Sequence, residues 1–183
     1  MEYSQFYEEY GHPFSGRKLR RLEEFLHSMQ LRYDEGVQYT VNLVTRDGEI
    51  AATGSLQDNV IKCVAVDDKY QGEGLSSRIV TLLLNYAMEN GKSHLFVFTK
   101  PKNRAMFSDL GFYPIIETQD VLFMENVRGG IQKYVQSLQR PQQKGGVIGA
   151  AVMNCNPFTN GHRYLIETAA AQCDIPVSYT HLR

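Results

Sequence analysis

The fold is decided by the stretch Val147-Ile148-Gly149-Ala150-Ala151-Val152-Met153-Asn154-Cys155-Asn156-Pro157-Phe158-Thr159-Asn160-Gly161-His162. Its first part, residues 147–153, is apolar and is bounded by glycines on one side and by Asn and Pro on the other, which is typical of a strand buried on both faces of a parallel sheet. After the loop, apolar side chains recur at helical spacing, namely Leu165, Ile166, Ala169, Ala170 and Cys173. The stretch therefore predicts a strand, a loop and a helix that begins near Gly161.

The loop carries residue types that suit phosphate chemistry. The first turn of a helix presents unpaired N–H groups and the positive end of the helix dipole, which together attract anions. Gly161 lets the backbone approach a phosphate closely, and His162 can donate a hydrogen bond to a phosphoryl oxygen as its charge grows. The loop therefore predicts a nucleotide site. The alternative is that His162 only caps the helix.

The run from Val152 to Glu167, with Thr159-Asn160-Gly161-His162 at its centre, resembles the T/H-x-G-H signature of the nucleotidyltransferase superfamily and, over its whole length, the citrate lyase ligase family. The resemblance implies that His162 stabilises the transition state. It also implies that Thr159 and the amides near Gly161 contact phosphate, and that Asn154 and Asn156 shape the nucleotide pocket.

That resemblance also implies an activity. The family activates acetate with ATP and magnesium, and passes the acetyl group to the prosthetic-group thiol on the acyl carrier subunit of citrate lyase. Two alternatives remain open from the sequence. One is an adenylyltransferase that acts on a phosphorylated cofactor precursor. The other is a binding module without catalysis that docks on the lyase complex.

The sequence before residue 130 alternates between helical and strand periodicity. Residues 1–14 have no clear period and are expected to be irregular or a short helix. The ranges predicted beyond them are helices at 15–29, 75–90, 103–110 and 131–138, and strands at 38–44, 49–53, 60–66, 94–99 and 121–124, with Arg46-Asp47-Gly48 as a hairpin turn.

A glycine-bearing loop precedes the helix predicted to begin at residue 75, and such a loop can hold a pyrophosphate through backbone amides. The patterns Gln71-x-x-Gly74-x-Ser76 and Asn103-x-Ala105-x-Phe107-x-x-x-Gly111-Phe112 resemble the GNAT acyltransferase family across residues 15–126. The resemblance implies that coenzyme A, or a pantetheine-like arm, contacts a small set of residues: Gln71, Gly72, Gly74 and Ser76.

One position departs from the GNAT pattern. Many members of that family carry a tyrosine where this sequence has Phe107, and that tyrosine returns a proton to the departing thiolate. Phenylalanine has no proton to give. Tyr113 is the nearby alternative. The sequence therefore predicts a coenzyme A or pantetheine-like binding fold whose own transferase chemistry is in question.

These resemblances imply an α/β protein in three parts. Residues 1–128 are expected to form a GNAT-like α+β domain with a mixed, mainly antiparallel sheet, and residues 129–146 a helical connector and linker. Residues 147–183 are expected to form the first βα unit of a Rossmann-like nucleotidyltransferase domain. Such domains take about 100 to 150 residues, so we expect a truncated domain that exposes apolar surface on its first strand.

The composition limits the kinds of partner and site that the protein is expected to have. The 183 residues are 43% hydrophobic and 21% charged with a net charge of -1, which excludes a global positive field for nucleic acid. Neither a membrane-length apolar run nor a leader pattern occurs, so we expect a cytoplasmic protein without membrane contact. The cysteines are widely spaced and are expected to be reduced thiols; they are Cys63, Cys155 and Cys173. We also expect that the protein itself binds no metal ion.

Overall fold

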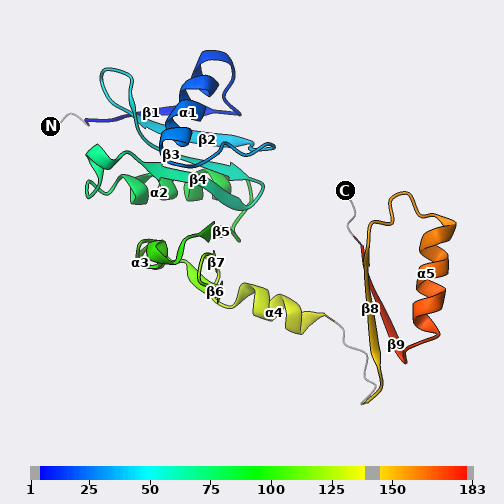
Figure 1. The fold of residues 1–183 in the computed structure, drawn as a ribbon. Coiled ribbons are helices and arrows are strands. Elements are labelled where there is room, and N and C mark those ends of the chain that lie inside the picture. The colour runs from blue at the N-terminus through cyan, green and yellow to red at the C-terminus, as the bar shows by residue number, and fades with distance from the viewer. Residues whose placement is uncertain (1–4, 139–144, 181–183) are drawn as a thin grey trace. The chain divides into compact units, whose positions relative to one another are not determined.

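The computed structural model describes residues 5–138 and 145–180. The chain forms two compact units, Met1–Val135 and Gln136–Arg183, coloured from blue to yellow-green and from yellow to red in Figure 1. The division falls inside the predicted connector, and residues 139–144 of the predicted linker lie outside the described residues. The exact domain limits 1–128, 129–146 and 147–183 stay a prediction.

The first unit is built on a mixed seven-stranded sheet in the order β1-β2-β3-β4-β5-β7-β6. Every neighbouring pair is antiparallel except β4 and β5, which are parallel. The predicted mixed, mainly antiparallel sheet is therefore confirmed. The strands are β1 Tyr7–Gly11, β2 Tyr39–Val44, β3 Ile50–Gln57, β4 Val60–Val66, β5 Phe96–Thr99, β6 Tyr113–Glu117 and β7 Leu122–Glu125.

The helices of this unit follow the predicted ranges closely. None of the helices in the described part of the chain combines the length and the apolar character that crossing a membrane requires. The α-helices are α1 Gly16–Ser28, α2 Leu75–Glu89, α3 Arg104–Asp109 and α4 Gly130–Ser137, and the 3-10 turns are η1 Asp68–Tyr70 and η2 Pro101–Asn103.

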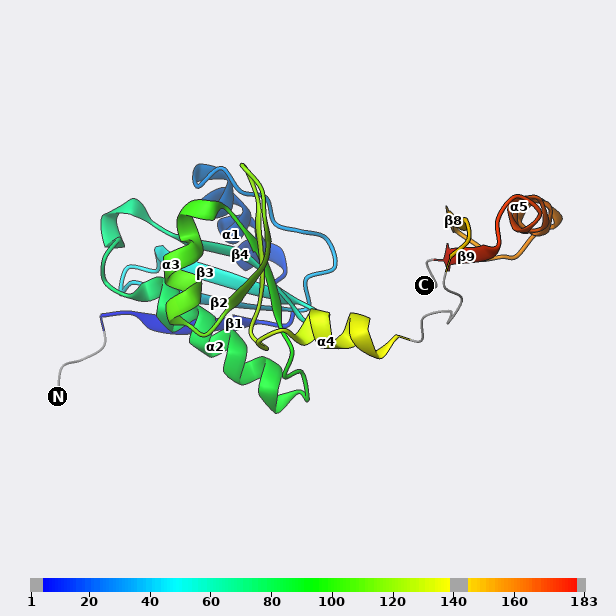
Figure 2. The same cartoon turned by 90° about the horizontal axis from the view of Figure 1, so that it is seen from below.

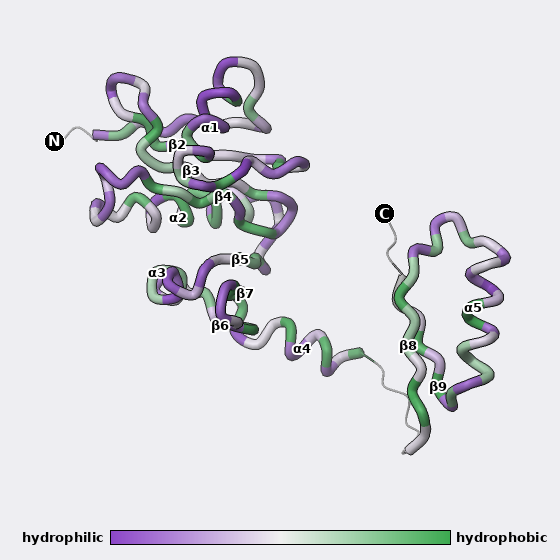
Figure 3. The backbone as a smooth tube through the Cα atoms, in the orientation of Figure 1, coloured by the Kyte–Doolittle hydropathy of each residue, from purple (hydrophilic) through white to green (hydrophobic). Residues whose placement is uncertain are grey.

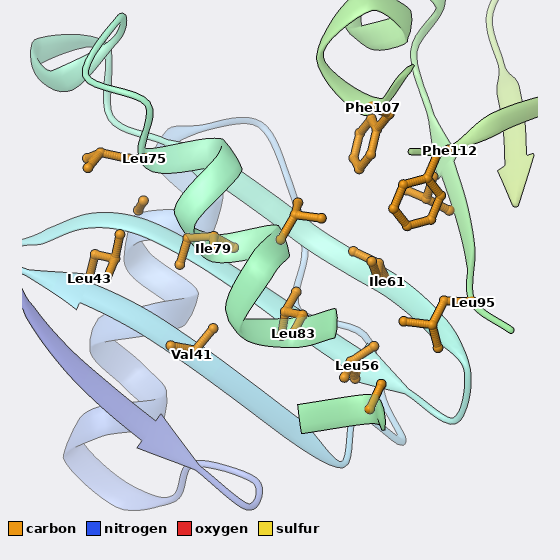
Figure 4. Close-up of a cluster of buried hydrophobic side chains, with 14 of the residues drawn as sticks. Val41, Leu43, Leu56, Ile61, Leu75, Ile79, Leu83, Leu95, Phe107 and Phe112 are labelled. Atoms are coloured by element: carbon orange, nitrogen blue, oxygen red, sulfur yellow. The ribbon is translucent and has the colours of Figure 1, made fainter. Parts of the chain in front are cut away.

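Helices α1 and α2 cover opposite faces of the β2-β3-β4 part of the sheet (Figure 1). On the α2 face, Ile79 and Leu83 are fully buried in the cluster that contains Val41 and Leu43 (Figure 4). Gly54 of β3 permits this contact, because a Cβ there would lie 2.4 Å from Cγ2 of Ile79. On the other face, Leu22 and Leu26 of α1 pack in a second cluster with Ile50 and Ala65.

Two edge strands were not predicted. Residues 1–14 were expected to be irregular or helical, which is wrong for Tyr7–Gly11, because β1 pairs along its length with β2. Ion pairs from Glu9 to Lys18, at 3.1 Å, and to Arg21 hold this strand to α1. Strand β6 contains Pro114, which lacks a backbone donor and is tolerated at a sheet edge.

The last strand of the first unit is joined firmly to the helix that follows it. The buried Glu125 of β7 accepts a hydrogen bond from the Ile131 amide at 3.0 Å, and its Oε2 lies 2.7 Å from Nε2 of His94. Gly130 has no room for a side chain, since a Cβ would lie 2.6 Å from the His94 ring. The start of α4 is therefore set by the sheet.

The second unit is a strand, helix and strand. Strand β8 Ile148–Met153 pairs in parallel with β9 Ile175–Thr180, and α5 Asn160–Ala170 lies on one side of them (Figure 2). The parallel βα unit is as predicted, and β9 forms despite Pro176. Gly149 lets the chain after α5 approach β8, because a Cβ there would lie 2.6 Å from Sγ of Cys173.

The prediction that this first strand is buried on both faces is wrong for the described residues. Side chains of β8 alternate between exposed and partly buried, and Ile148 and Val152 are 66% and 84% exposed. The hydropathy colouring shows this apolar strand in green (Figure 3). One helix covers one face, so the apolar surface expected on β8 is present.

Candidate functional site

Strands β4 and β5 separate soon after they meet. Their pairing comprises Val60 with Phe96 and Ile61 with Val97. Beyond that point β4 is distorted, since Cys63 has a φ of 53°, and the β3–β4 register shifts between Thr53 and Ser55. The parting strands leave a space in the sheet.

A cavity of about 780 Å³ occupies this space. Its walls include the apolar side chains of Val64, Val97, Met106 and Phe107, while its charged lining residues are Lys62, Lys100, Lys102 and Asp120. The cavity lining therefore carries an excess of positive charge in a chain whose net charge is -1. A long, thin ligand with an apolar stem and an anionic end suits such a lining.

The four residues predicted to bind coenzyme A or a pantetheine-like arm, Gln71, Gly72, Gly74 and Ser76, all line this cavity. Gly72 and Gly74 have φ values of 89° and 73°, a backbone region that favours glycine. Gly74 is the N-cap of α2 and makes no side-chain capping hydrogen bond. The first amides of α2 are therefore available to an anion. The Gln71 side chain instead donates to Asp68.

The proton donor typical of the GNAT pattern is missing from the cavity. Phe107 lines it and is 1% exposed, with its ring edge-on to Phe112 at 5.6 Å. Tyr113 is 40% exposed and is not one of the described lining residues. The tyrosine that does line the cavity is Tyr70, whose ring meets Phe6 edge-on.

Sequence reasoning missed several of the lining residues. Cys63 lines the cavity, and its Sγ donates to the Arg32 carbonyl at 3.4 Å. Burial raises the pKa of the Cys63 thiol. Lys100 and Lys102 follow the end of β5, on either side of Pro101. Only the divergence of β4 and β5 brings these residues together, and local sequence patterns do not encode that divergence.

The second predicted site lies at the N-terminus of α5. Thr159 is the N-cap, and its Oγ1 accepts a hydrogen bond from the His162 amide at 3.5 Å. In return the Thr159 amide donates to Nδ1 of His162 at 3.0 Å, so the two residues form a capping box. The alternative prediction that His162 caps the helix is therefore confirmed, and its role toward a nucleotide stays a prediction.

The cap leaves the other ring nitrogen of His162 available. Because Nδ1 accepts a backbone N–H, the neutral ring carries its hydrogen on Nε2. No hydrogen bond of Nε2 is present within residues 5–138 and 145–180. The Thr159–His162 capping box thus fixes both the ring orientation and the tautomer, and it leaves a directed N–H donor.

The other predicted nucleotide residues shape the loop. Oδ1 of Asn154 accepts a hydrogen bond from the Asn156 amide at 3.2 Å, which stabilises a turn directly after β8. Gly161 has open space beside it, since a Cβ would meet Thr159 Oγ1 at an ordinary 3.7 Å. No cluster of three or more His, Cys, Asp or Glu side chains suited to a metal ion occurs in the described part of the chain.

Comparison with protein families gives two matches. The acetyltransferase (GNAT) family matches residues 3–112. The citrate lyase ligase C-terminal domain matches residues 148–179, a range that includes β8, the His162 loop and α5.

Among curated proteins, the chain is 42% identical over 159 residues to the [citrate [pro-3S]-lyase] ligase of Escherichia coli, a match that covers 86% of this chain and 45% of the relative. It is 44% identical over 154 residues to the Klebsiella pneumoniae protein of the same name, covering 84% of this chain and 45% of the relative. The chain therefore spans about half the length of the curated relatives it matches.

Solved structures show the fold of the first unit. Escherichia coli ElaA superposes with a TM-score of 0.58 at 14% identity, covering 67% of this chain and 99% of ElaA. An acyl-CoA N-acyltransferase from Pseudomonas aeruginosa gives a TM-score of 0.55 at 16% identity, covering 66% of this chain and 97% of that protein. At these identities the likeness concerns the fold alone.

Proposed function

We propose that this chain, which belongs to the acetyltransferase (GNAT) family through residues 3–112, acts in the ATP-dependent acetylation of the prosthetic-group thiol on the acyl carrier subunit of citrate lyase. One observation carries the proposal. The chain combines a cavity suited to a thiol arm, with Phe107 at the position of the usual proton donor, with a separate loop in which Nδ1 of His162 is held by the Thr159 amide and Nε2 is left to donate.

In this proposal the first unit holds the arm and does not itself transfer an acyl group. Phosphate oxygens of the arm accept hydrogen bonds from the amides around Gly72 and Gly74, and the apolar walls contact its stem. Phe107 has no proton to return to a thiolate, so the position where many members of the GNAT family carry their proton donor is without one here. A bound thiol is what a ligase needs as its acceptor.

The second unit serves the activation step. A carboxylate oxygen of acetate attacks the α-phosphorus of ATP, the bond from that phosphorus to the bridging oxygen breaks, and pyrophosphate leaves with magnesium supplied alongside the nucleotide. His162 Nε2–H donates to an α-phosphoryl oxygen as its charge grows. Thr159 and the amides near Gly161 support the phosphates, and Asn154 and Asn156 shape the loop.

The thiol then completes the reaction. Its sulfur attacks the acetyl carbonyl of acetyl-adenylate, the bond from that carbon to the phosphate oxygen breaks, AMP leaves, and the thiol proton passes to solvent. The products are the acetyl thioester, AMP and pyrophosphate. The chain spans 45% of the Escherichia coli relative, so the whole reaction is tested with the remaining part of that relative supplied.

Pyrophosphate release tests the proposal. The chain is fused to the part of the Escherichia coli relative that it does not cover, and release is followed with ATP, acetate and the thiol form of the carrier. We expect release that depends on acetate. Release that instead requires a phosphate monoester would identify an adenylyltransferase, and no release under any condition would identify a docking module.

Isothermal titration calorimetry tests whether the cavity of the first unit binds coenzyme A. Coenzyme A is titrated into the full chain, with Gly74→Ala as the matched variant. We expect saturable binding by the original chain that the variant weakens. If the original chain binds no coenzyme A, the cavity does not hold a pantetheine-like arm.

A further inference from the structure

The rim of the cavity carries a pair of cations with no partner in the described structure. Lys100 and Lys102 are exposed, and both line the cavity. Within residues 5–138 and 145–180, neither takes part in an ion pair, whereas Lys62 pairs with Asp34 at 2.9 Å and Lys92 pairs with Asp58 at 3.0 Å. We refer to Lys100 and Lys102 as the rim lysines.

The backbone that presents the rim lysines is well fixed. Pro101 lies between them and sets its own φ, and the η2 turn is closed by a hydrogen bond from the Asn103 amide to the Lys100 carbonyl at 3.0 Å. The Asn103 side chain also donates to Oγ1 of Thr99 at 2.8 Å. The turn therefore holds two positive charges at the end of β5, on the same cavity that Gly72 and Gly74 line.

A thiol arm attached to a protein enters the cavity in one orientation. Its thiol end is free, while its phosphate end is joined to the carrier. If the phosphates lie on the amides at Gly72 and Gly74, the carrier protein lies outside the cavity, where the exposed Lys100 and Lys102 also face solvent. Lysine side chains at this place can then reach the carrier surface as well as the arm.

We propose that an acidic surface of the carrier protein docks on the rim lysines Lys100 and Lys102 while its arm occupies the cavity. This inference rests on the proposed function and adds where, and through which charges, the partner binds. Charge complementarity favours an acidic surface, because the cavity's charged lining is mainly basic although the whole chain has a net charge of -1. Exposed rim charges of this kind raise the association rate and make binding salt-dependent.

A second basic surface supplies a matched control. Arg17 and Arg20 are exposed on α1, which covers the opposite face of the sheet from α2, and neither is a cavity lining residue. Within the described residues neither makes an ion pair. Arg17→Glu with Arg20→Glu changes the net charge by the same amount as Lys100→Glu with Lys102→Glu, but away from the cavity.

The test measures two ligands on the original chain and on the two double variants. Biolayer interferometry gives the affinity for the thiol-form citrate lyase carrier at low and at roughly physiological salt, and calorimetry gives the affinity for free coenzyme A. We expect the rim double variant to weaken carrier binding by about tenfold or more with a reduced salt dependence. Its coenzyme A affinity should fall by clearly less than its carrier affinity, because the amides at Gly72 and Gly74 remain, and the α1 double variant should bind both ligands like the original chain.

Other outcomes would contradict the inference, and each shows whether the docking surface or the proposed function is wrong. Equal losses of carrier and coenzyme A in the rim variant would mean that the lysines contact only the arm's phosphates. Carrier binding that the rim variant retains, or that the α1 variant loses, would place the docking surface elsewhere while leaving the proposed function intact. If the original chain binds coenzyme A but no carrier, the proposed partner itself is wrong.

Discussion

Two helix N-termini in this chain face proposed phosphate sites, and they are built differently. Helix α2 begins at Gly74, which has a φ of 73° and no side-chain capping hydrogen bond. Helix α5 begins at Thr159, and the capping box with His162 occupies the amide of His162. The first terminus offers bare amides. At the second terminus the His162 amide already donates to Thr159, and the free donor in the described part of the chain is a side-chain group, Nε2 of His162.

The difference teaches what each site is suited for. Backbone amides at a glycine cap bind an anion without moving and do not act as a general acid or base, which suits holding a phosphate-bearing arm. An imidazole whose tautomer is set by a cap places one N–H donor in a fixed direction, which suits stabilising charge that develops during a reaction. We therefore propose binding for the α2 terminus and chemistry for the α5 terminus.

The largest expected effect comes from removing the imidazole. His162→Ala in the fused chain should lower acetate-dependent pyrophosphate release by about a hundredfold or more, because it removes a donor to the transition state. Thr159→Ala is the matched change, since it removes the capping hydroxyl and keeps the ring, and its rate should fall by less than about tenfold. Equal losses in the two variants would mean that His162 acts only as a cap.

Alanine at the two glycines should have opposite effects on stability. Gly74→Ala should cost about 1 kcal/mol, because its backbone is left-handed, and should weaken coenzyme A binding by about tenfold. Gly161→Ala lies in the first turn of α5 with open space, so stability should rise by up to about 1 kcal/mol while ATP affinity falls.

Thermal unfolding and calorimetry on the same samples check both glycine variants. Gly161→Ala should leave coenzyme A affinity unchanged, and Gly74→Ala should leave ATP affinity unchanged. A variant that weakens both ligands would remove the distinction between the two helix termini.

The smallest effect is a difference in cysteine protection. Cys63 lines the cavity, and Cys155 lies in the loop before α5. Desulfo-coenzyme A, which has no thiol to consume the alkylating reagent, should slow alkylation of Cys63 by about fivefold and ATP should slow that of Cys155, with Cys173 as the reference, as read by mass spectrometry. Because burial raises the pKa of the Cys63 thiol, its thiolate is scarcer at a given pH, and its alkylation rate should level off at a higher pH than that of an ordinary exposed thiol. Protection of Cys63 by ATP would contradict separate sites.

Much of the fold could be predicted because most elements carry their own periodic pattern. The spacing of apolar residues predicts strand β4 and helices α1, α2 and α5. The strands that sequence missed, β1 and β6, lie at the two edges of the sheet, so few of their side chains are buried. Pairing to a distant partner, and for β1 the ion pairs of Glu9, stabilises them, and neither appears in a local pattern.

The residues of the candidate sites could be predicted where they belong to one short sequence motif. The glycine loop at α2 and the loop at α5 were both placed by sequence, and the Thr159-to-His162 spacing is that of a capping box. The cavity's other residues were not. Cys63 and the rim lysines meet the glycine loop only because β4 and β5 part after Ile61 and Val97, which is a tertiary property.

The central claim is that the arm and the nucleotide occupy different sites of one chain, and competition calorimetry tests it most directly. Coenzyme A is titrated into the fused chain with and without saturating ATP. We expect the same coenzyme A affinity and one equivalent bound in both titrations. If ATP displaces coenzyme A, the two ligands share the α2 cavity, and the assignment of nucleotide chemistry to His162 is contradicted.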